Sequence, residues 1–239
     1  MSDRVFVSGA HAIGDCVPIR GSDARKLTTV LRRRTGDRIE VIDSTAQRFA
    51  ATLEIADRSV VATLNEQLAT PAQPQRFEIT VAQAIPKGQK MDFVVEKLTE
   101  LGVATIMPFY SERTIPQVSR RETRWQRLAA AAAQQSGRSE IPTVEAPGDF
   151  EALVERFGNY DCVLFLWELA EQRPLRASLP TLVERAKSIL VIVGPEGGFS
   201  SAEAAAAQQH GAHFLSLGRR IVRTETAAIV MLAILNYLA

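Results

Sequence analysis

The residues best suited to chemistry lie near the C-terminus, around the loop G-P-E-G-G-F-S at residues 194–200. The apolar run at residues 189–193 predicts a short buried strand before this loop, and Ser200 and Glu203 have the spacing of a capping box for a helix after it. An alanine run continues that helix to Gly211, a residue type favoured in left-handed C-terminal caps. Strand, glycine loop and helix in this order are typical of ligand sites at the carboxyl end of a parallel sheet.

This loop does not match the common nucleotide-binding motifs. It has no Lys-Ser/Thr after its glycines, as a P-loop would, and its glycine spacing is not G-x-G-x-x-G. Glu196 would also repel a pyrophosphate, so a neutral or cationic ligand is favoured. A plain tight turn explains the loop alone equally well.

A second strand, polar loop and helix follow at residues 213–216, 217–226 and 227–238. The loop L-G-R-R-I-V-R-T-E-T holds more charged and hydroxyl groups than a connection between core elements needs. The helix is almost wholly apolar but shorter than the roughly 20 residues of a membrane span. We therefore expect a core or interface helix and no membrane segment.

Taken together, G-P-E-G-G-F-S and L-G-R-R-I-V-R-T-E-T-A closely resemble the cofactor signatures of the SPOUT methyltransferases. Within that superfamily the resemblance is to the RsmE family, which methylates N3 of one uridine in 16S ribosomal RNA. Similar segments occur along the chain: V-L-R-R-R-T-G-D at 30–37, K-L-T-E-L-G-V at 97–103 and Q-Q-S-G-R-S-E-I-P at 134–142. The chain departs from the family at Gln134, where an acid is usual, and near Arg25, where a His is often found.

Alternating strands and helices from residue 77 onward predict an α/β domain with a mainly parallel sheet. The pattern alone predicts an unknotted sheet, whereas the resemblance implies a SPOUT-type trefoil knot and a homodimer formed through the knotted domain. The first 70 residues contain alternating short strands, and the resemblance implies a PUA-like RNA-binding β-barrel there. We expect domains at 1–70 and 77–239, joined by a linker at 71–76. Ser22 or Asp23 is expected to cap a helix in the first domain.

The resemblance implies S-adenosylmethionine (SAM) as the cofactor, held by three loops. The implied contact residues are Leu166, Trp167, Glu168, Val193, Gly194, Pro195, Glu196, Gly197, Gly198, Leu215, Leu217, Gly218, Ile221, Arg223 and Thr224. Uracil N3 carries a proton at neutral pH, so the site has to remove it or stabilise the developing anion. Arg223 is the candidate for holding the uracil carbonyls, and either Glu196 or Glu225 for accepting the proton.

The expected partner is 16S ribosomal RNA in the small ribosomal subunit. The resemblance implies RNA contacts from Arg4, Arg25, Arg32, Arg33, Lys87 and Arg138. A formal net charge of +1 is not that of a strongly basic RNA-binding protein, so local clusters have to supply the attraction. The alternative is that the arginine run at the helix end is only a solvent-exposed face that interacts favourably with the helix dipole.

The composition, 46% apolar and 23% charged residues, is that of an ordinary soluble protein. The cysteines and histidines lack the spacing of metal ligands, and no cleaved signal peptide is expected, so we expect a cytoplasmic, metal-free protein. Two other functions stay open. One is a SPOUT methyltransferase acting on another RNA position or a ribose hydroxyl; the other is a non-catalytic RNA-binding ribosome assembly factor.

Overall fold

The computed structural model describes residues 3–56, 59–69, 76–114, 122–168 and 175–239. The chain forms two compact units, one of residues 1–73 and 133–140 and the other of residues 74–132 and 141–239. The expected linker at 71–76 lies, apart from Arg76, outside the described residues. The domain boundaries drawn from the sequence therefore stay a prediction.

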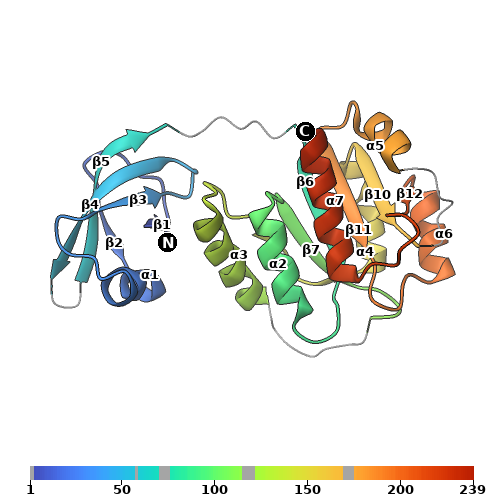
Figure 1. Ribbon diagram of the computed structural model, residues 1–239, viewed down its shortest axis with the longest axis horizontal. Coiled ribbons are helices and arrows are strands. Elements are labelled where there is room, and N and C mark those ends of the chain that lie inside the picture. The colour runs from blue at the N-terminus through green and yellow to red at the C-terminus, as the bar shows by residue number, and fades with distance from the viewer. Residues whose placement is uncertain (1–2, 57–58, 70–75, 115–121, 169–174) are drawn as a thin grey trace. The chain divides into compact units, whose positions relative to one another are not determined.

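The first unit is built on one mixed five-stranded sheet that curls around its own core (Figure 1). Its strands are β1 (Arg4–Phe6), β2 (Cys16–Ile19), β3 (Arg38–Ile42), β4 (Arg48–Ala56) and β5 (Ser59–Leu68). They lie in the order β1-β3-β4-β5-β2, with β1 parallel to β3 and the other pairs antiparallel. The alternating apolar residues seen in the sequence point into this core, as the barrel-like prediction required.

A short helix follows β2 in this unit, but it does not begin where the sequence suggested. Helix α1 (Gly21–Arg25) continues directly into the π-helical turn η1 (Lys26–Val30). Arg20 occupies the N-cap and makes no side-chain cap hydrogen bond, so the predicted cap at Ser22 or Asp23 is wrong. Ser22 and Asp23 lie inside the helix because β2 ends at Ile19 and the helix already begins at Gly21.

The second unit is an α/β domain with a parallel sheet, as predicted. Its strands are β6 (Glu78–Ala84), β7 (Thr105–Tyr110), β8 (Thr143–Val144), β9 (Gly148–Asp149), β10 (Cys162–Leu166), β11 (Ser188–Val193) and β12 (His213–Leu215). They lie in the order β12-β10-β11-β6-β7-β8, and β9 also pairs with β7. The central strands are almost continuously apolar because helices cover both of their faces.

Helices divide between the two faces of this sheet (Figure 1). They are α2 (Lys90–Glu100), α3 (Glu122–Ser136), α4 (Phe150–Glu155), α5 (Leu175–Val183), α6 (Ser201–Gln209) and α7 (Thr224–Leu238), with the 3₁₀ turn η2 (Phe157–Asn159) after α4. Helices α2, α5, α7 and the start of α3 share one core, and α4 and α6 share the other.

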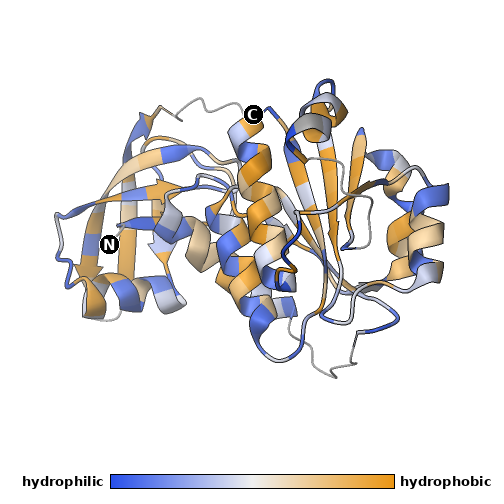
Figure 2. Ribbon diagram, turned by 45° about the vertical axis from the view of Figure 1, so that its right-hand side comes forward, coloured by the Kyte–Doolittle hydropathy of each residue, from blue (hydrophilic) through white to orange (hydrophobic). Residues whose placement is uncertain are grey.

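Helix α7 begins at Thr224, three residues earlier than the apolar run suggested, and packs against α2, β11 and β6. Most of its residues are apolar (Figure 2), and Ala228, Met231, Leu232 and Leu235 are fully buried. This confirms the expected core helix; the trefoil threading stays a prediction. Among the helices of the described chain, none has the length and hydropathy that a membrane span requires.

Candidate functional site

Three loops leave the sheet at the same level. Leu166, at the end of β10, pairs with Val193 at the end of β11 and with Leu215 at the end of β12. Val193 in turn pairs with Gln83 near the end of β6. Because parallel strands end at one edge, the segments predicted to hold a ligand are brought together at the carboxyl edge of the sheet.

The glycines of the loop after β11 are required by close protein neighbours. A Cβ atom on Gly194 would lie 2.8 Å from Cε2 of Phe199, whose buried ring stacks in an aromatic cluster. Gly198 has a φ of +68°, and a Cβ there would lie 2.7 Å from Oε1 of Glu168. At Gly197 a Cβ would approach Cβ of Arg113 to 3.3 Å. The loop is therefore packed tightly from several sides, which a simple exposed turn would not need.

The helix after this loop begins and ends as the sequence predicted. Ser200 accepts a hydrogen bond from the Glu203 amide, and the Glu203 carboxylate accepts one from the Ser200 amide, which completes the capping box. Gly211 has a φ of +83°, the left-handed conformation expected after the helix. Glu203 also accepts a hydrogen bond of 3.0 Å from the amide of Glu112, which joins the loop after β7 to this helix.

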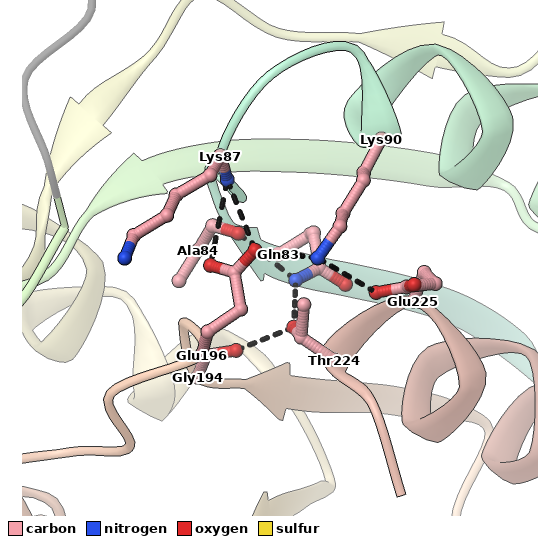
Figure 3. A network of polar contacts seen from close by, with 8 residues as sticks. All are labelled: Gln83, Ala84, Lys87, Lys90, Gly194, Glu196, Thr224 and Glu225. Atoms are coloured by element: carbon pink, nitrogen blue, oxygen red, sulfur yellow. Dashed lines mark hydrogen bonds and ion pairs between the residues drawn. The ribbon is translucent and has the colours of Figure 1, made fainter.

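Thr224, the first residue of α7, ties that helix to the glycine loop (Figure 3). Its Oγ1 donates to the carbonyl oxygen of Gly194 at 2.5 Å and accepts from Nε2 of Gln83 at 2.8 Å. Gln83 is fully buried. A hydroxyl bonded on both sides fixes the N-terminus of α7 against β6 and the loop. The sequence analysis missed Gln83, although a glutamine at the end of a largely apolar strand was a visible signal.

The two candidate proton acceptors lie on either side of Lys90, which the sequence analysis also missed (Figure 3). Glu196 Oε1 accepts from Lys90 Nζ at 2.8 Å, and the Glu196 carboxylate also accepts from the backbone amide of Lys87. Partial burial works against ionisation of Glu196, but the hydrogen bonds from Lys90 and from backbone amides outweigh it and lower its pKa. This weighs against Glu196 as a base. Glu225 Oε2 lies 3.9 Å from Lys90 Nζ.

The loop after β10 contributes an aromatic wall. The Trp167 amide donates to the Leu215 carbonyl at 2.9 Å, and its indole meets the Phe214 ring edge-on at 5.4 Å between centroids. Its Nε1 is buried and has no hydrogen-bond partner among the described residues. A buried indole N–H usually finds an acceptor, so this donor is suited to a ligand. Glu168 is exposed beside Gly198.

The loop after β12 is more open. Ser216 Oγ lies 3.3 Å from both the amide and the carbonyl of Gly218, whose φ is +112°. Leu217 is half-buried, whereas Ile221 is 89% exposed. Arg223 is exposed at the N-cap of α7, so its guanidinium is available to a ligand at this edge.

Two of the arginines expected to bind RNA are held inside the first unit. Arg4 pairs with Glu40 at 2.8 Å and is largely buried. Arg33 pairs with Asp3 and with Asp37. Their positions favour a role in stabilising the unit over direct contact with RNA.

Gln134, where the resemblance led us to expect an acid, is buried in the same unit. Its amide donates to the Arg4 carbonyl, and its Oε1 accepts from Lys26 Nζ at 2.5 Å. A neutral amide supplies both a donor and an acceptor here, which a carboxylate would not do.

The remaining RNA candidates differ in exposure. Arg25 and Arg32 are exposed in the first unit, and Arg32 has a φ of +53°. Lys87 is exposed in the second unit, and its ammonium points away from the Glu196 carboxylate (Figure 3). Arg138 is half-buried, and burial lowers the pKa of its guanidinium despite the nearby Glu140 carboxylate.

No group of three His, Cys, Asp or Glu side chains is placed to hold a metal ion within the described ranges. Cys162 is buried in β10, and burial raises the pKa of its thiol to about 11, so it is not a reactive thiolate.

Comparisons with known proteins identify the family to which the chain is similar. A family model described as an RNA methyltransferase domain matches residues 73–236. The ribosomal RNA small subunit methyltransferase E of Synechocystis is 31% identical over all of this chain and 78% of its own length, and that of Bacillus subtilis is 28% identical over 92% of this chain and 89% of its own.

Two solved structures share the whole fold. The chain superposes with a TM-score of 0.88 on the ribosomal RNA small subunit methyltransferase E of Neisseria gonorrhoeae bound to SAM, at 28% identity, covering 100% of this chain and 98% of the other. It superposes with a TM-score of 0.89 on a methyltransferase from Legionella pneumophila in complex with SAM, at 28% identity, covering 99% and 98% of the two chains.

Proposed function

Because the chain belongs to the RsmE family of ribosomal RNA small subunit methyltransferases, we propose that it transfers a methyl group from SAM to N3 of a uridine in 16S ribosomal RNA. The observation that carries this proposal is that β10, β11 and β12 end side by side at the carboxyl edge of the sheet. This arrangement brings the two signature loops, residues 194–200 and 217–226, and the loop of Trp167 into one site. Thr224 joins the N-terminus of α7 to that site.

The residues at this edge fit SAM. Trp167 offers a buried N–H without a protein acceptor among the described residues, and Gly198, at a φ of +68°, lets the loop pass close to the Glu168 carboxylate. The carboxylates of Glu196 and Glu225 suit a ligand that carries a cationic sulfonium. When bound, SAM supplies an electrophilic methyl group. We assign its contacts to the residues of the three loops that the sequence analysis named.

The chain's own groups then align and activate the uridine. Methyl transfer is an in-line displacement, so the nucleophile has to be held behind the methyl group. Arg223, exposed at the N-cap of α7, donates to the uracil carbonyls and favours the anion that forms when N3 loses its proton. Glu225 or Glu196 accepts that proton. The uridine has to leave any base stack to reach the methyl group.

We assign RNA binding outside the methyl-transfer site chiefly to the exposed side chains of Arg25, Arg32 and Lys87. Arg138 is half-buried and retains a part in this proposal, whereas Arg4 and Arg33 support the first unit through their carboxylate partners. Exposed cations attract phosphates without the cost of breaking an existing ion pair.

The double variant Arg25→Ala/Arg32→Asn is expected to weaken RNA binding and to flatten its salt dependence. Each lost phosphate contact should lower the slope of log K against log salt by about 0.7 to 0.9. Asparagine tolerates the positive φ of residue 32, so the backbone is preserved. Binding to unmodified small subunits is measured across a salt series. Arg33→Ala is the control, and it is expected to lower thermal stability while having less effect on the salt slope. A slope that is unchanged in the double variant would mean that Arg25 and Arg32 are solvent-exposed side chains without phosphate contacts.

Three further features belong to the proposal. The partner is the small ribosomal subunit, and we place the protein in the cytoplasm where that subunit is assembled. The C-terminal segment forms the trefoil knot of SPOUT domains. The protein is a homodimer through this domain, a proposal supported by the exposed apolar side chains of Tyr237 on α7 and Phe93 on α2, 88% and 47% exposed.

Methyl transfer from labelled SAM to small subunits lacking modification, followed by nucleoside analysis, tests the proposed function. Label in N3-methyluridine is the expected result. Label in another nucleoside would move the protein to a different RNA target. SAM binding without any transfer would reject this substrate, and no SAM binding would favour an assembly factor.

A further inference from the structure

Lys90, the first residue of α2, places its ammonium between the two carboxylates of the site (Figure 3). Its Nζ lies 2.8 Å from Oε1 of Glu196 and 3.9 Å from Oε2 of Glu225. Glu196 lies in the loop after β11, and Glu225 in the first turn of α7. One side chain therefore joins three elements that are distant in sequence, although it belongs to neither signature loop.

The two carboxylates are not equivalent. Glu196 is well supplied with donors: Lys90 Nζ bonds to Oε1, and the Lys87 amide lies 3.2 Å from Oε1 and 3.4 Å from Oε2. Oε2 of Glu225 is buried and accepts no hydrogen bond from any residue that the structure describes. A buried carboxylate oxygen without a donor is unfavourable, and an N–H group from a ligand would relieve that cost.

We infer that Lys90 is a positioning residue that anchors Glu196 within the glycine loop and holds Glu225 by an ion pair of 3.9 Å to Oε2, an oxygen that receives no hydrogen bond from the described residues and can accept one from a substrate N–H. This rests on the proposed function, since uracil N3–H is the donor that reaction supplies. Glu225 Oε2 takes the proton from N3, N3 forms its bond to the methyl carbon, and the electron pair of the broken carbon–sulfur bond stays on sulfur. Lys90 acts through the two acids and does not touch the substrate.

The charge of Lys90, considered alone, predicts the opposite change in SAM affinity from the one that a positioning role predicts, so SAM binding distinguishes the two. A lysine near a site for a cationic sulfonium repels that ligand, so removing its charge should strengthen SAM binding. A lysine that holds the carboxylates in place should, when removed, let them move and repel each other. SAM binding and turnover should then both become weaker.

The experiment compares Lys90→Met with the wild-type protein. We expect kcat for methyl transfer to unmodified small subunits to fall about 10- to 100-fold, as for small misplacements of catalytic groups. The Kd for SAM, measured by titration calorimetry without RNA, should rise. Lys90→Arg should recover most of the loss because it can pair with both acids. Lys97→Met is the matched control on the same helix, because Lys97 forms ion pairs with its helix neighbours Glu96 and Glu100 and lies over the ring of Phe93.

A double variant tests whether Lys90 acts through Glu225. Lys90→Met/Glu225→Gln is expected to have nearly the kcat of Glu225→Gln alone, because residues that work as one unit are not additive. The inference would be overturned if the losses of kcat in Lys90→Met and in Glu225→Gln multiplied in the double variant. It would also be overturned if Lys90→Met bound SAM more tightly than the wild type, or if its kcat and Kd matched those of Lys97→Met. If Lys90→Met does not fold, Lys90→Gln replaces it. A wild-type protein without transferase activity would reject the proposed function, while the SAM titrations would still decide whether Lys90 organises the loop.

Discussion

Replacing Arg223 by alanine is expected to lower kcat for methyl transfer about 100- to 1000-fold, the size of effect seen when a donor to a developing anion is removed. The guanidinium presents several fixed donors to the uracil carbonyls, and these interactions strengthen as N3 loses its proton. Since Arg223 is exposed at the start of α7, its removal should leave the fold intact. Steady-state transfer of label to unmodified small subunits measures kcat.

The Kd for SAM separates the two roles proposed for Arg223. A catalytic role predicts that Kd changes far less than kcat. A SAM affinity that falls in proportion to turnover would make Arg223 a cofactor contact only. Arg185→Ala provides the control, because Arg185 is an exposed arginine before β11, at the amino edge of the sheet and away from the site. Its kcat should stay within about twofold of the wild type, as expected for a surface substitution.

The substitution Gly198→Val is expected to weaken SAM binding about 100-fold or more, equivalent to roughly 2.7 kcal/mol. A branched side chain is strained at a φ of +68°, and its Cβ would lie 2.7 Å from Glu168 Oε1. The loop would have to change its path at the edge where the three loops meet. Titration calorimetry with SAM measures the effect, with thermal unfolding to follow stability.

Gly211→Val is the matched control for this change. Gly211 has a similar φ of +83°, but a Cβ there meets nothing within 4 Å, and it lies beyond the far end of α6. The Gly211→Val variant should lose about as much stability as Gly198→Val and keep the SAM affinity of the wild type. Gly197→Val should lie between the two, because Gly197 lacks a positive φ, although a Cβ there would lie 3.3 Å from Cβ of Arg113. Equal SAM affinity in all three variants would refute the loop assignment.

Local signals in the sequence were sufficient for much of the second unit. The apolar run at residues 189–193 predicted β11 (Ser188–Val193) to within one residue, because a buried parallel strand has apolar residues on both faces. The capping box at Ser200 and the left-handed Gly211 were also confirmed, since both depend on residues within one helical turn.

The same local signals did not reveal partners that are distant in sequence. Arg4 and Arg33 carry charges that suggest RNA contact, which stays a prediction, and the fold adds an acidic partner to each: strand pairing brings Glu40 beside Arg4, and Asp3 lies beside Arg33. In the first helix, the turn after β2 placed the N-cap at Arg20 and not at Ser22 or Asp23. Neither result follows from residue type alone.

The sequence by itself therefore determined the signature loops, the strands and helices that carry them, and the candidate acids and arginine. Only the tertiary structure decided which of these groups already have partners. Lys90 and Gln83 come from segments far from both signature loops, and they meet Glu196, Glu225 and Thr224 because parallel strands bring their ends to one edge. Hydrogen bonds and ion pairs depend on distances that folding creates, so the division of roles between two similar carboxylates is a property of the folded chain.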